Sequence, residues 1–250
     1  MHNGGNKLTF IFKQIKRPDS GCVTYMIGSK ETGECIIVDP LLDIDFVVDE
    51  AKIESSCKII GVIDTHTHAD HISGARNLAK RFKLPGVYMY ADSGSKFKTI
   101  PVTDGHILRL GNIELRFIHT PGHTNDHMCI LVDNSKLLTG DTMLIGDVGR
   151  IDLGLDPREN SDRLYESLHN KLLRLDDDVE IFPLHIGAAH HLGEKNTTST
   201  IGKERTNSPA LTPKNKDEFF KYMTEDWPPK PPDYQNIIRL NRGETSIEII

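Results

Sequence analysis

The sequence lacks any apolar run that could cross a membrane. A transmembrane helix needs about 20 predominantly apolar residues, and no stretch of this 250-residue chain approaches that length. The N-terminal run from Leu8 to Phe12 is also too short for the core of a signal peptide. We therefore expect no membrane partner and a cytoplasmic location.

Cysteine is scarce as well. The four cysteines are Cys22, Cys35, Cys57 and Cys129, and no two of them form a CxxC pair. This spacing argues against a disulfide framework and against a zinc knuckle, because both need cysteines at close, regular positions. Cys35 and Cys129 lie in apolar, strand-like runs, so we expect buried, reduced thiols.

Basic residues are not in excess either. The 30 Lys and Arg residues are outnumbered by 36 Asp and Glu, and the net charge is −6 with His neutral. A nucleic-acid-binding protein needs a basic face, whereas the cationic residues here are scattered. We therefore expect neither nucleic acid nor an anionic membrane surface as a partner. The length allows a sizeable core in one large domain or two small ones.

Strand-like and helix-like segments alternate over most of the chain. Runs of β-branched residues between turn signals predict strands, and apolar positions at helical spacing predict helices. We expect strands at 22–28, 34–40, 58–64 and 87–90, a pair within 106–123 about Gly111-Asn112, a pair within 128–141, and a last strand at 178–185. We expect helices at 43–55, 72–82 and 158–173.

The C-terminal part differs in composition. Residues 193–209 are polar and loop-like, and residues 227–235 hold four prolines in nine residues. This composition predicts an extended surface wrap. We expect a single domain over residues 1–250, in which 227–250 form a proline-rich C-terminal extension.

The stretch THTHADH crowds three histidines and an aspartate into one short segment. An extended segment would project His66 and His68 to the same side, because side chains alternate along a strand. A helix that starts near Ala69 would carry Asp70 and His71 in its first turn. All four side chains could then face one centre, and such a cluster of ionisable groups is wasteful without a cation.

Each candidate ligand follows a strand-like run. His66 and His68 come directly after KIIGVID, and three further residues follow later strands: His123, Asp141 and His185. Strand ends on a packed sheet are rigid, so these side chains can converge at one edge. Imidazole and carboxylate bind zinc and iron alike. The residues alone therefore leave the metal and the number of ions open.

Four motifs, in this order, resemble the metallo-β-lactamase superfamily: THTHADH, TPGHT (120–124), TGDT (139–142) and PLH (183–185). The resemblance implies an α/β fold, a four-layer αββα sandwich with the metal site at one edge of the two sheets. THTHADHISGARNLA, GDTMLIGDVGRIDL (140–153) and STIGKERTNSPAL (199–211) are similar to its persulfide dioxygenase (sulfur dioxygenase) branch. The chain is most similar to members often fused to rhodanese domains, but we expect no rhodanese domain in this chain.

The persulfide dioxygenase resemblance implies one non-haem Fe(II) per chain, held by His66, His123 and Asp141. Two histidines and one carboxylate leave positions open for O₂ and substrate. The implied reaction oxidises a low-molecular-weight thiol persulfide, such as glutathione persulfide, with O₂ to sulfite and free thiol. The other motif residues would orient the ligands and relay protons. They are His68, Asp70, His71 and His185, of which the last three are the catalytic candidates.

The same residues also fit a thioester hydrolase with two zinc ions, similar to hydroxyacylglutathione hydrolase. One ion would use His66, His68 and His123, the other Asp70, His71 and His185, with Asp141 as a bridge. A metal-bound hydroxide would then attack the thioester carbonyl. Residue identities do not separate the two arrangements, although GDVGRIDL and STIGKER favour the dioxygenase. A non-catalytic metal-binding scaffold is least favoured, because no ligand is missing.

Arg150 and Asp152, in GRID, are candidates for binding the substrate, because a guanidinium fork suits a carboxylate. Their alternative role is a local salt bridge that shapes the loop. Tyr234 in the proline-rich tail is a candidate for one wall of the substrate groove. Three further histidines are interpreted as residues around the site or on the surface: His119, His190 and His191. Two kinds of protein partner are considered: a second copy of this chain in a homodimer, and a separate sulfurtransferase or rhodanese as a functional partner.

Overall fold

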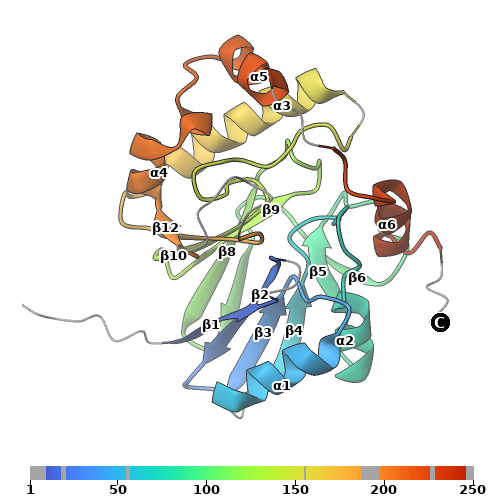
Figure 1. Cartoon of the computed structure of the whole chain (residues 1–250). Coiled ribbons are helices and arrows are strands. Elements are labelled where there is room, and N and C mark those ends of the chain that lie inside the picture. The colour runs from blue at the N-terminus through green and yellow to red at the C-terminus, as the bar shows by residue number, and fades with distance from the viewer. Residues whose placement is uncertain are drawn as a thin grey trace, which may run out of the picture.

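Two β-sheets stacked face to face form the centre of the protein (Figure 1). The computed structural model describes residues 10–17, 21–54, 57–154, 156–186, 197–225 and 229–245. In spatial order, the first sheet contains β1 (Phe10–Lys16), β2 (Val23–Ser29), β3 (Glu34–Val38), β4 (Lys58–Ile63), β5 (Val87–Tyr90) and β6 (Thr99–Val102). The second contains β12 (Ser199–Thr200), β11 (Glu180–Pro183), β10 (Lys136–Gly140), β9 (Met128–Val132), β8 (Ile113–His119) and β7 (Ile107–Leu110).

Both sheets are mixed. Strands β1 to β3 pair antiparallel, and β3 to β6 pair parallel. In the second sheet β7 to β10 form an antiparallel meander, and β10 pairs parallel with β11. The carboxyl ends of β4, β8, β10 and β11 lead into the segments that carry the candidate ligands. Because parallel neighbours end at the same edge, these segments meet there.

Helices cover the outer faces of both sheets (Figure 1). The first sheet packs against α1 (Ile44–Glu54) and α2 (Ala75–Arg81), and the second against α3 (Pro157–Glu166), α4 (Ile201–Asn207) and α5 (Lys216–Glu225). The remaining helix, α6 (Tyr234–Asn241), lies at the side of the first sheet near β5 and β6. This arrangement confirms the predicted four-layer αββα sandwich.

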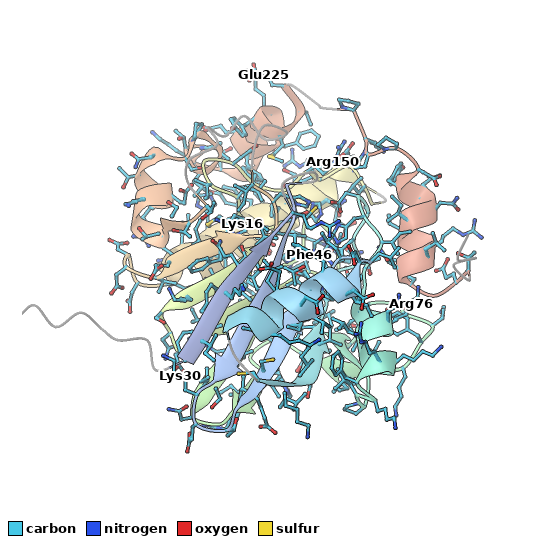
Figure 2. All side chains as sticks on the ribbon, turned by 60° about the horizontal axis from the view of Figure 1, so that its bottom comes forward. Lys16, Lys30, Phe46, Arg76, Arg150 and Glu225 are labelled. Carbon is cyan, nitrogen blue, oxygen red and sulfur yellow. The ribbon has the colours of Figure 1, made fainter. Side chains whose placement is uncertain are left out.

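Three apolar clusters hold the sandwich together. Figure 2 shows the side chains on the ribbon, with Phe46 labelled on α1. Tyr25 and Phe117 are fully buried between the sheets. Leu164 and Phe219 fill the layer between the second sheet and its helices. Every residue of β9 is buried, as expected for a strand covered on both faces. The core therefore fixes the strand ends rigidly.

Most of the predicted elements are confirmed, but three expectations are wrong. No helix starts near Ala69: residues 65–74 form an irregular loop, and the helix that follows begins at Ala75. The segment 193–209 is not a loop throughout, because α4 begins after Thr200, whose hydroxyl accepts a hydrogen bond from Lys203 N. The proline-rich tail turns into α6 at Tyr234. Among the described residues, no helix has the length and apolar character needed to cross a bilayer.

Candidate metal centre

The loop that follows β4, residues 65–74, is shaped by side chains from other elements. Asp39 accepts hydrogen bonds from the backbone N–H of Thr65 (2.7 Å) and from its hydroxyl (2.9 Å). Asp126 accepts in the same way from the N–H (3.0 Å) and the hydroxyl (2.6 Å) of Thr67. The backbone of these residues therefore bonds to carboxylates and not to a neighbouring strand or to the next turn of a helix. The two threonines of THTHADH are therefore structural.

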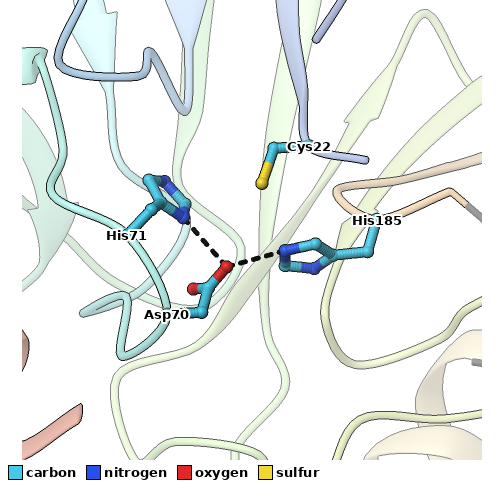
Figure 3. A group of neighbouring side chains, drawn as sticks. All are labelled: Cys22, Asp70, His71 and His185. Carbon is cyan, nitrogen blue, oxygen red and sulfur yellow. Dashed lines mark hydrogen bonds and ion pairs between the residues drawn. The ribbon is translucent and has the colours of Figure 1, made fainter. Parts of the chain in front are cut away.

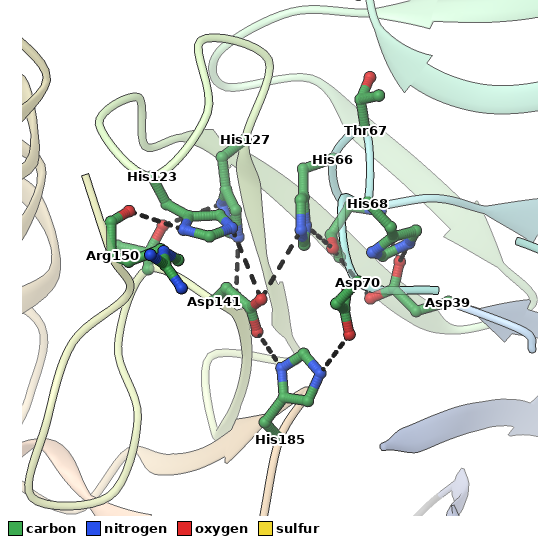
Figure 4. A network of polar contacts seen from close by, with 12 residues as sticks. Asp39, His66, Thr67, His68, Asp70, His123, His127, Asp141, Arg150 and His185 are labelled. Atoms are coloured by element: carbon green, nitrogen blue, oxygen red, sulfur yellow. Dashed lines mark hydrogen bonds and ion pairs between the residues drawn. The ribbon is translucent and has the colours of Figure 1, made fainter. Parts of the chain in front are cut away.

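The first group of candidate ligands is His66, His123 and Asp141 (Figure 4). The Thr65 hydroxyl gives its proton to Asp39, so its oxygen accepts from His66 Nδ1 at 3.0 Å. In the same way His123 Nδ1 donates to the backbone carbonyl of Arg150 at 2.9 Å. Both rings are thereby fixed in the tautomer that carries its proton on Nδ1. Their Nε2 lone pairs remain for another partner.

Both Nε2 atoms face the same carboxylate oxygen. Asp141 Oδ2 lies 3.8 Å from His66 Nε2 and 3.6 Å from His123 Nε2, too far for hydrogen bonds. Among the described residues, the buried His66 Nε2 has no hydrogen-bond partner. Burial, reinforced by neighbouring imidazoles, holds the pKa of His66 well below its usual range, so the ring is neutral. Two imidazoles and a carboxylate around a shared space fit a divalent cation.

His127 supports this group and was not predicted from the sequence. Its Nε2 accepts a hydrogen bond from the backbone N–H of Asp141 at 2.9 Å, and its ring stacks on His66 with centroids 4.7 Å apart. Its Nδ1 contacts the hydroxyls of Thr120 and Thr142. His127 therefore positions the backbone of one candidate ligand and the ring of another. A second histidine in PGHTNDH was the only signal.

Two glycines allow the backbone to approach this group. A Cβ on Gly140, which has a left-handed φ of 49°, would lie 2.4 Å from His127 Nε2. A Cβ on Gly149 would lie 1.8 Å from the carbonyl oxygen of Asp141 and 3.0 Å from His123 Nδ1. A side chain at Gly140 would displace the supporting His127, and one at Gly149 would displace the candidate ligands Asp141 or His123. The second glycine of GDVGRIDL, Gly149, is therefore required because a Cβ would not fit there.

His185 joins this group to a second one (Figure 4). Its Nδ1 lies 2.7 Å from Asp141 Oδ1, and its Nε2 lies 2.8 Å from Asp70 Oδ2. Burial opposes charge on the ring, but Asp141 and Asp70 raise the pKa of His185 well above its usual value. Since both partners are carboxylates, both ring nitrogens carry protons. His185 is thus an imidazolium that bridges two candidate residues.

The second group contains Asp70, His71, His185 and Cys22, whose ligand atoms lie within 4.8 Å of one another (Figure 3). His71 Nδ1 lies 3.1 Å from the Asp70 oxygen that also contacts His185. Cys22 forms an isolated antiparallel bridge with His185. Burial alone would raise the pKa of the Cys22 thiol, yet His185 and His71 lower it to about 6. No sequence pattern indicated this role, because Cys22 opens an ordinary apolar strand.

The His68 ring lies between the two groups, with its centroid 4.3 Å from that of His66 and 4.4 Å from that of His71. Its Nε2 is 3.3 Å from Asp39 Oδ1 and 3.9 Å from Asp64 Oδ1, and the ring is fully buried. Although burial opposes protonation, the two carboxylates raise the pKa of His68 well above its usual range. His66 and His68 project side by side as expected, although the chain bends at residues 65–66 instead of forming an extended strand.

The predicted substrate-binding residues are brought together. Arg150 contacts Asp152 through two nitrogens, at 2.6 and 2.9 Å, and donates to the Pro229 carbonyl at 3.0 Å. Lys230, which was not predicted, lies 4.0 Å from Asp152 and 5.1 Å from the centre of the Tyr234 ring. The salt bridge anticipated for Arg150 and Asp152 is therefore present. It also ties the proline-rich tail to the candidate metal centre.

The additional histidines take no part in these groups where they are described. His119 stacks on Tyr90 with ring centroids 3.8 Å apart and donates from Nε2 to the Asn125 carbonyl at 2.8 Å. It stabilises the loop between β8 and β9. His190 and His191 lie outside the described residues. All four cysteines are free, and three of them are buried, with Cys57 half-buried.

Comparison with known proteins gives consistent matches. The family model of the metallo-beta-lactamase superfamily matches residues 17–185. Human mitochondrial persulfide dioxygenase ETHE1 is 33% identical over 231 residues, which cover 91% of this chain and 86% of that protein. The crystal structure of ETHE1 from Myxococcus xanthus is similar, with a TM-score of 0.82, 29% identity, and coverage of 93% of this chain and 98% of that one. A hydroxyacylglutathione hydrolase of Francisella tularensis subsp. novicida (strain U112) is 32% identical over 177 residues, which cover 69% of this chain and 67% of that protein.

Proposed function

The chain belongs to the metallo-beta-lactamase superfamily and is an oxidoreductase, and we propose that it is a persulfide dioxygenase that uses a single Fe(II). The substrate is a low-molecular-weight thiol persulfide such as glutathione persulfide. Persulfide, O₂ and water are converted to the free thiol and sulfite, with release of protons. The likeness to two ETHE1 proteins over nearly the whole chain supports this assignment.

The observation that carries the proposal is the fixed tautomer of His66 and His123. Each ring donates through Nδ1, so both Nε2 lone pairs lie toward Asp141 Oδ2. These three residues would hold the ion as a two-histidine, one-carboxylate set with open positions. When bound, Fe(II) would supply the redox chemistry by which O₂ reacts with a persulfide.

We propose one ion rather than two because the chain resembles the persulfide dioxygenases. In the two-ion arrangement, His185 would be a ligand of the second ion and would have to lose a proton that it shares with Asp141 or Asp70. His68 would likewise have to turn from Asp39 and Asp64 toward the first ion.

We assign proton movement to Asp70, His71 and His185. The reaction releases protons beside Asp141, and His185 links that residue to Asp70 through two short contacts. Asp70 is the outermost of the group, with its side chain 27% exposed. Burial disfavours its charged form, but His71 and His185 keep the pKa of Asp70 below its usual value, so it is an ionised acceptor. The chain Asp141–His185–Asp70 leads from the buried ligand toward solvent.

The thiol part of the substrate is proposed to lie along Arg150, Asp152, Lys230 and Tyr234. Arg150 bonds to Asp152 and to the Pro229 carbonyl, so it acts mainly by holding the tail that carries Lys230. We predict that Arg150→Ala raises KM for glutathione persulfide roughly tenfold, about 1.4 kcal/mol. Metal content should stay near wild type, because the Arg150 backbone carbonyl still accepts from His123. Unchanged KM alongside unchanged metal content would refute the proposed groove.

The decisive experiment is oxygen uptake with glutathione persulfide, measured on protein loaded with Fe(II) and on matched protein loaded with Zn(II). The iron protein should consume oxygen and form sulfite, and the zinc protein should not. His123→Ala should lose iron and activity together. Absence of oxygen uptake with glutathione, coenzyme A and cysteine persulfides would refute the proposal, as would two zinc ions per chain with activity that follows zinc.

A dinuclear zinc thioester hydrolase is the second candidate. It is favoured by the gathering of Cys22, Asp70, His71 and His185 within 4.8 Å, and by the similar hydroxyacylglutathione hydrolase. Anaerobic hydrolysis of S-lactoylglutathione at a rate above that of oxygen uptake would reverse the ranking. A homodimer and a separate sulfurtransferase or rhodanese partner stay predictions, to be tested by solution mass and by coupled turnover.

A further inference from the structure

The C-terminal helix α6 is attached to the rest of the protein mainly at its last residue. Of its eight residues, Asn241 is the buried one, with 7% of its surface exposed. The preceding residues of the helix are half-buried or exposed. Burial of apolar side chains therefore contributes little to holding α6 in place. The polar contacts of α6 must account for its position beside β5 and β6 (Figure 1).

Both the oxygen and the nitrogen of the Asn241 carboxamide form hydrogen bonds with the histidine loop, residues 65–74. Its Oδ1 accepts from the backbone N–H of Ser73 at 2.9 Å. Its Nδ2 donates to the carbonyl of His68 at 2.9 Å and to the carbonyl of His71 at 2.8 Å. One side chain from the far end of the chain thus holds three backbone groups on both sides of Asp70.

The middle of this loop depends on such contacts. Its ends are fixed by backbone bonds, from Met128 N to the Thr65 carbonyl and from Gly74 N to the Pro40 carbonyl. Between these ends the chain has neither helix nor strand. A backbone carbonyl taken out of water without a partner is costly, so the carbonyls that Asn241 satisfies set the path of the loop.

Asn241 is itself held in place. Arg76 of α2 donates to the Leu240 carbonyl at 2.7 Å, and Lys96 N donates to the Arg242 carbonyl at 2.7 Å. The last turn of α6 is therefore tied to α2 and to the segment between β5 and β6. The position of Asn241 is therefore set by contacts outside the histidine loop, and Asn241 can fix the path of that loop.

We propose that Asn241 is a positioning residue for the metal centre, which fixes residues 68–73 of the histidine loop and so, together with Asp39 and Asp126, supports the place of His66 without contacting the ion. The position requires one acceptor and two donors at the end of a short side chain, and asparagine supplies them. Aspartate keeps the acceptor and loses both donors, and glutamine is longer. This inference rests on the proposed ligand His66 but on no particular substrate.

The test compares Asn241→Ala and Asn241→Asp with a matched control, Asn236→Ala. Asn236 is exposed on the same helix, and its side chain donates to Asp233 at 3.3 Å. Hydrogen exchange of the metal-free protein should be at least tenfold faster at residues 65–74 in both Asn241 variants, with β8 and β9 unchanged. The dissociation constant of Fe(II), measured anaerobically against a chromogenic chelator, should rise about 10- to 100-fold. The control should match wild type in both measurements.

Asn241→Asp preserves volume and the acceptor for Ser73, so it serves if the alanine variant fails to fold. Wild-type loop exchange and wild-type Fe(II) affinity in a folded Asn241 variant would overturn the proposal. A lower Tm with no selective change in the loop or in Fe(II) affinity would also overturn it, since α6 would then only pack. Neither readout uses a persulfide. Failure of oxygen uptake would therefore refute the proposed reaction and leave this inference standing.

Discussion

The hydroxyl of Thr65 should control how well the protein binds its metal. Thr65→Val keeps the shape of the side chain but removes the oxygen that accepts from His66 Nδ1 and donates to Asp39 Oδ2. Both partners are buried, and a buried polar group left without a partner costs about 1–3 kcal/mol. The free energy of unfolding should fall by about 2 kcal/mol or more. For a chain of this length that lowers Tm by roughly 4–8 °C.

Metal affinity should fall as well, because the His66 ring loses the bond that fixes its tautomer. Substitutions that remove the orienting partner of a ligand histidine weaken metal binding by about 10- to 100-fold. Thr65→Ser is the control, since it keeps the hydroxyl and loses only a methyl group, at about 0.8 kcal/mol. Fe(II) affinity is measured anaerobically by chelator competition. Equal affinities for the valine and serine variants would refute the reasoning, because the hydroxyl would then have no part in orienting His66.

Three further predictions concern the same region. Gly149→Ala should abolish metal binding in a folded protein, because the new Cβ would collide with the Asp141 carbonyl; retention of stoichiometric metal would contradict this. The thiolate absorbance near 240 nm of the metal-free protein should titrate near pH 6, since the pKa of Cys22 is lowered to about 6, and this step should vanish in Cys22→Ser. Burial opposes charge on His185, yet Asp141 raises the pKa of the ring well above its usual value. The charged ring should therefore stabilise the metal-free fold fully below about pH 6.5, the pKa of histidine in an unfolded chain. This stabilisation should be lost as the pH rises through the raised pKa of the folded state. The Tm difference between wild type and His185→Gln should accordingly be larger at pH 6 than at pH 10, and a pH-independent difference would exclude the bridging imidazolium.

The fold was largely predictable from local signals. Alternating β-branched runs with clear turns gave most strands of both sheets, and helical spacing gave α1 and α3. The first strand, β6 and the helices after Thr200 were not predicted, because short edge strands and polar helices carry weak periodic signals. The loop at residues 65–74 was misread as extended and then helical. Its backbone follows carboxylates from distant segments, which no local pattern reveals.

The sequence by itself determined which residues can bind a metal, because THTHADH and the three later motifs together place histidines and aspartates, whose side chains bind metals, after hydrophobic strands. Only the tertiary structure decided which of these residues face a shared space and which pair with carboxylates. Asp39 and Asp64 lie beside His68, and Asp70 and Asp141 stabilise the charged form of His185, whereas the Nε2 atoms of His66 and His123 face Asp141. The orientation of an imidazole is set by whichever acceptor reaches its other nitrogen. Those acceptors come from elements far apart in the chain, and therefore only folding brings them to the histidines.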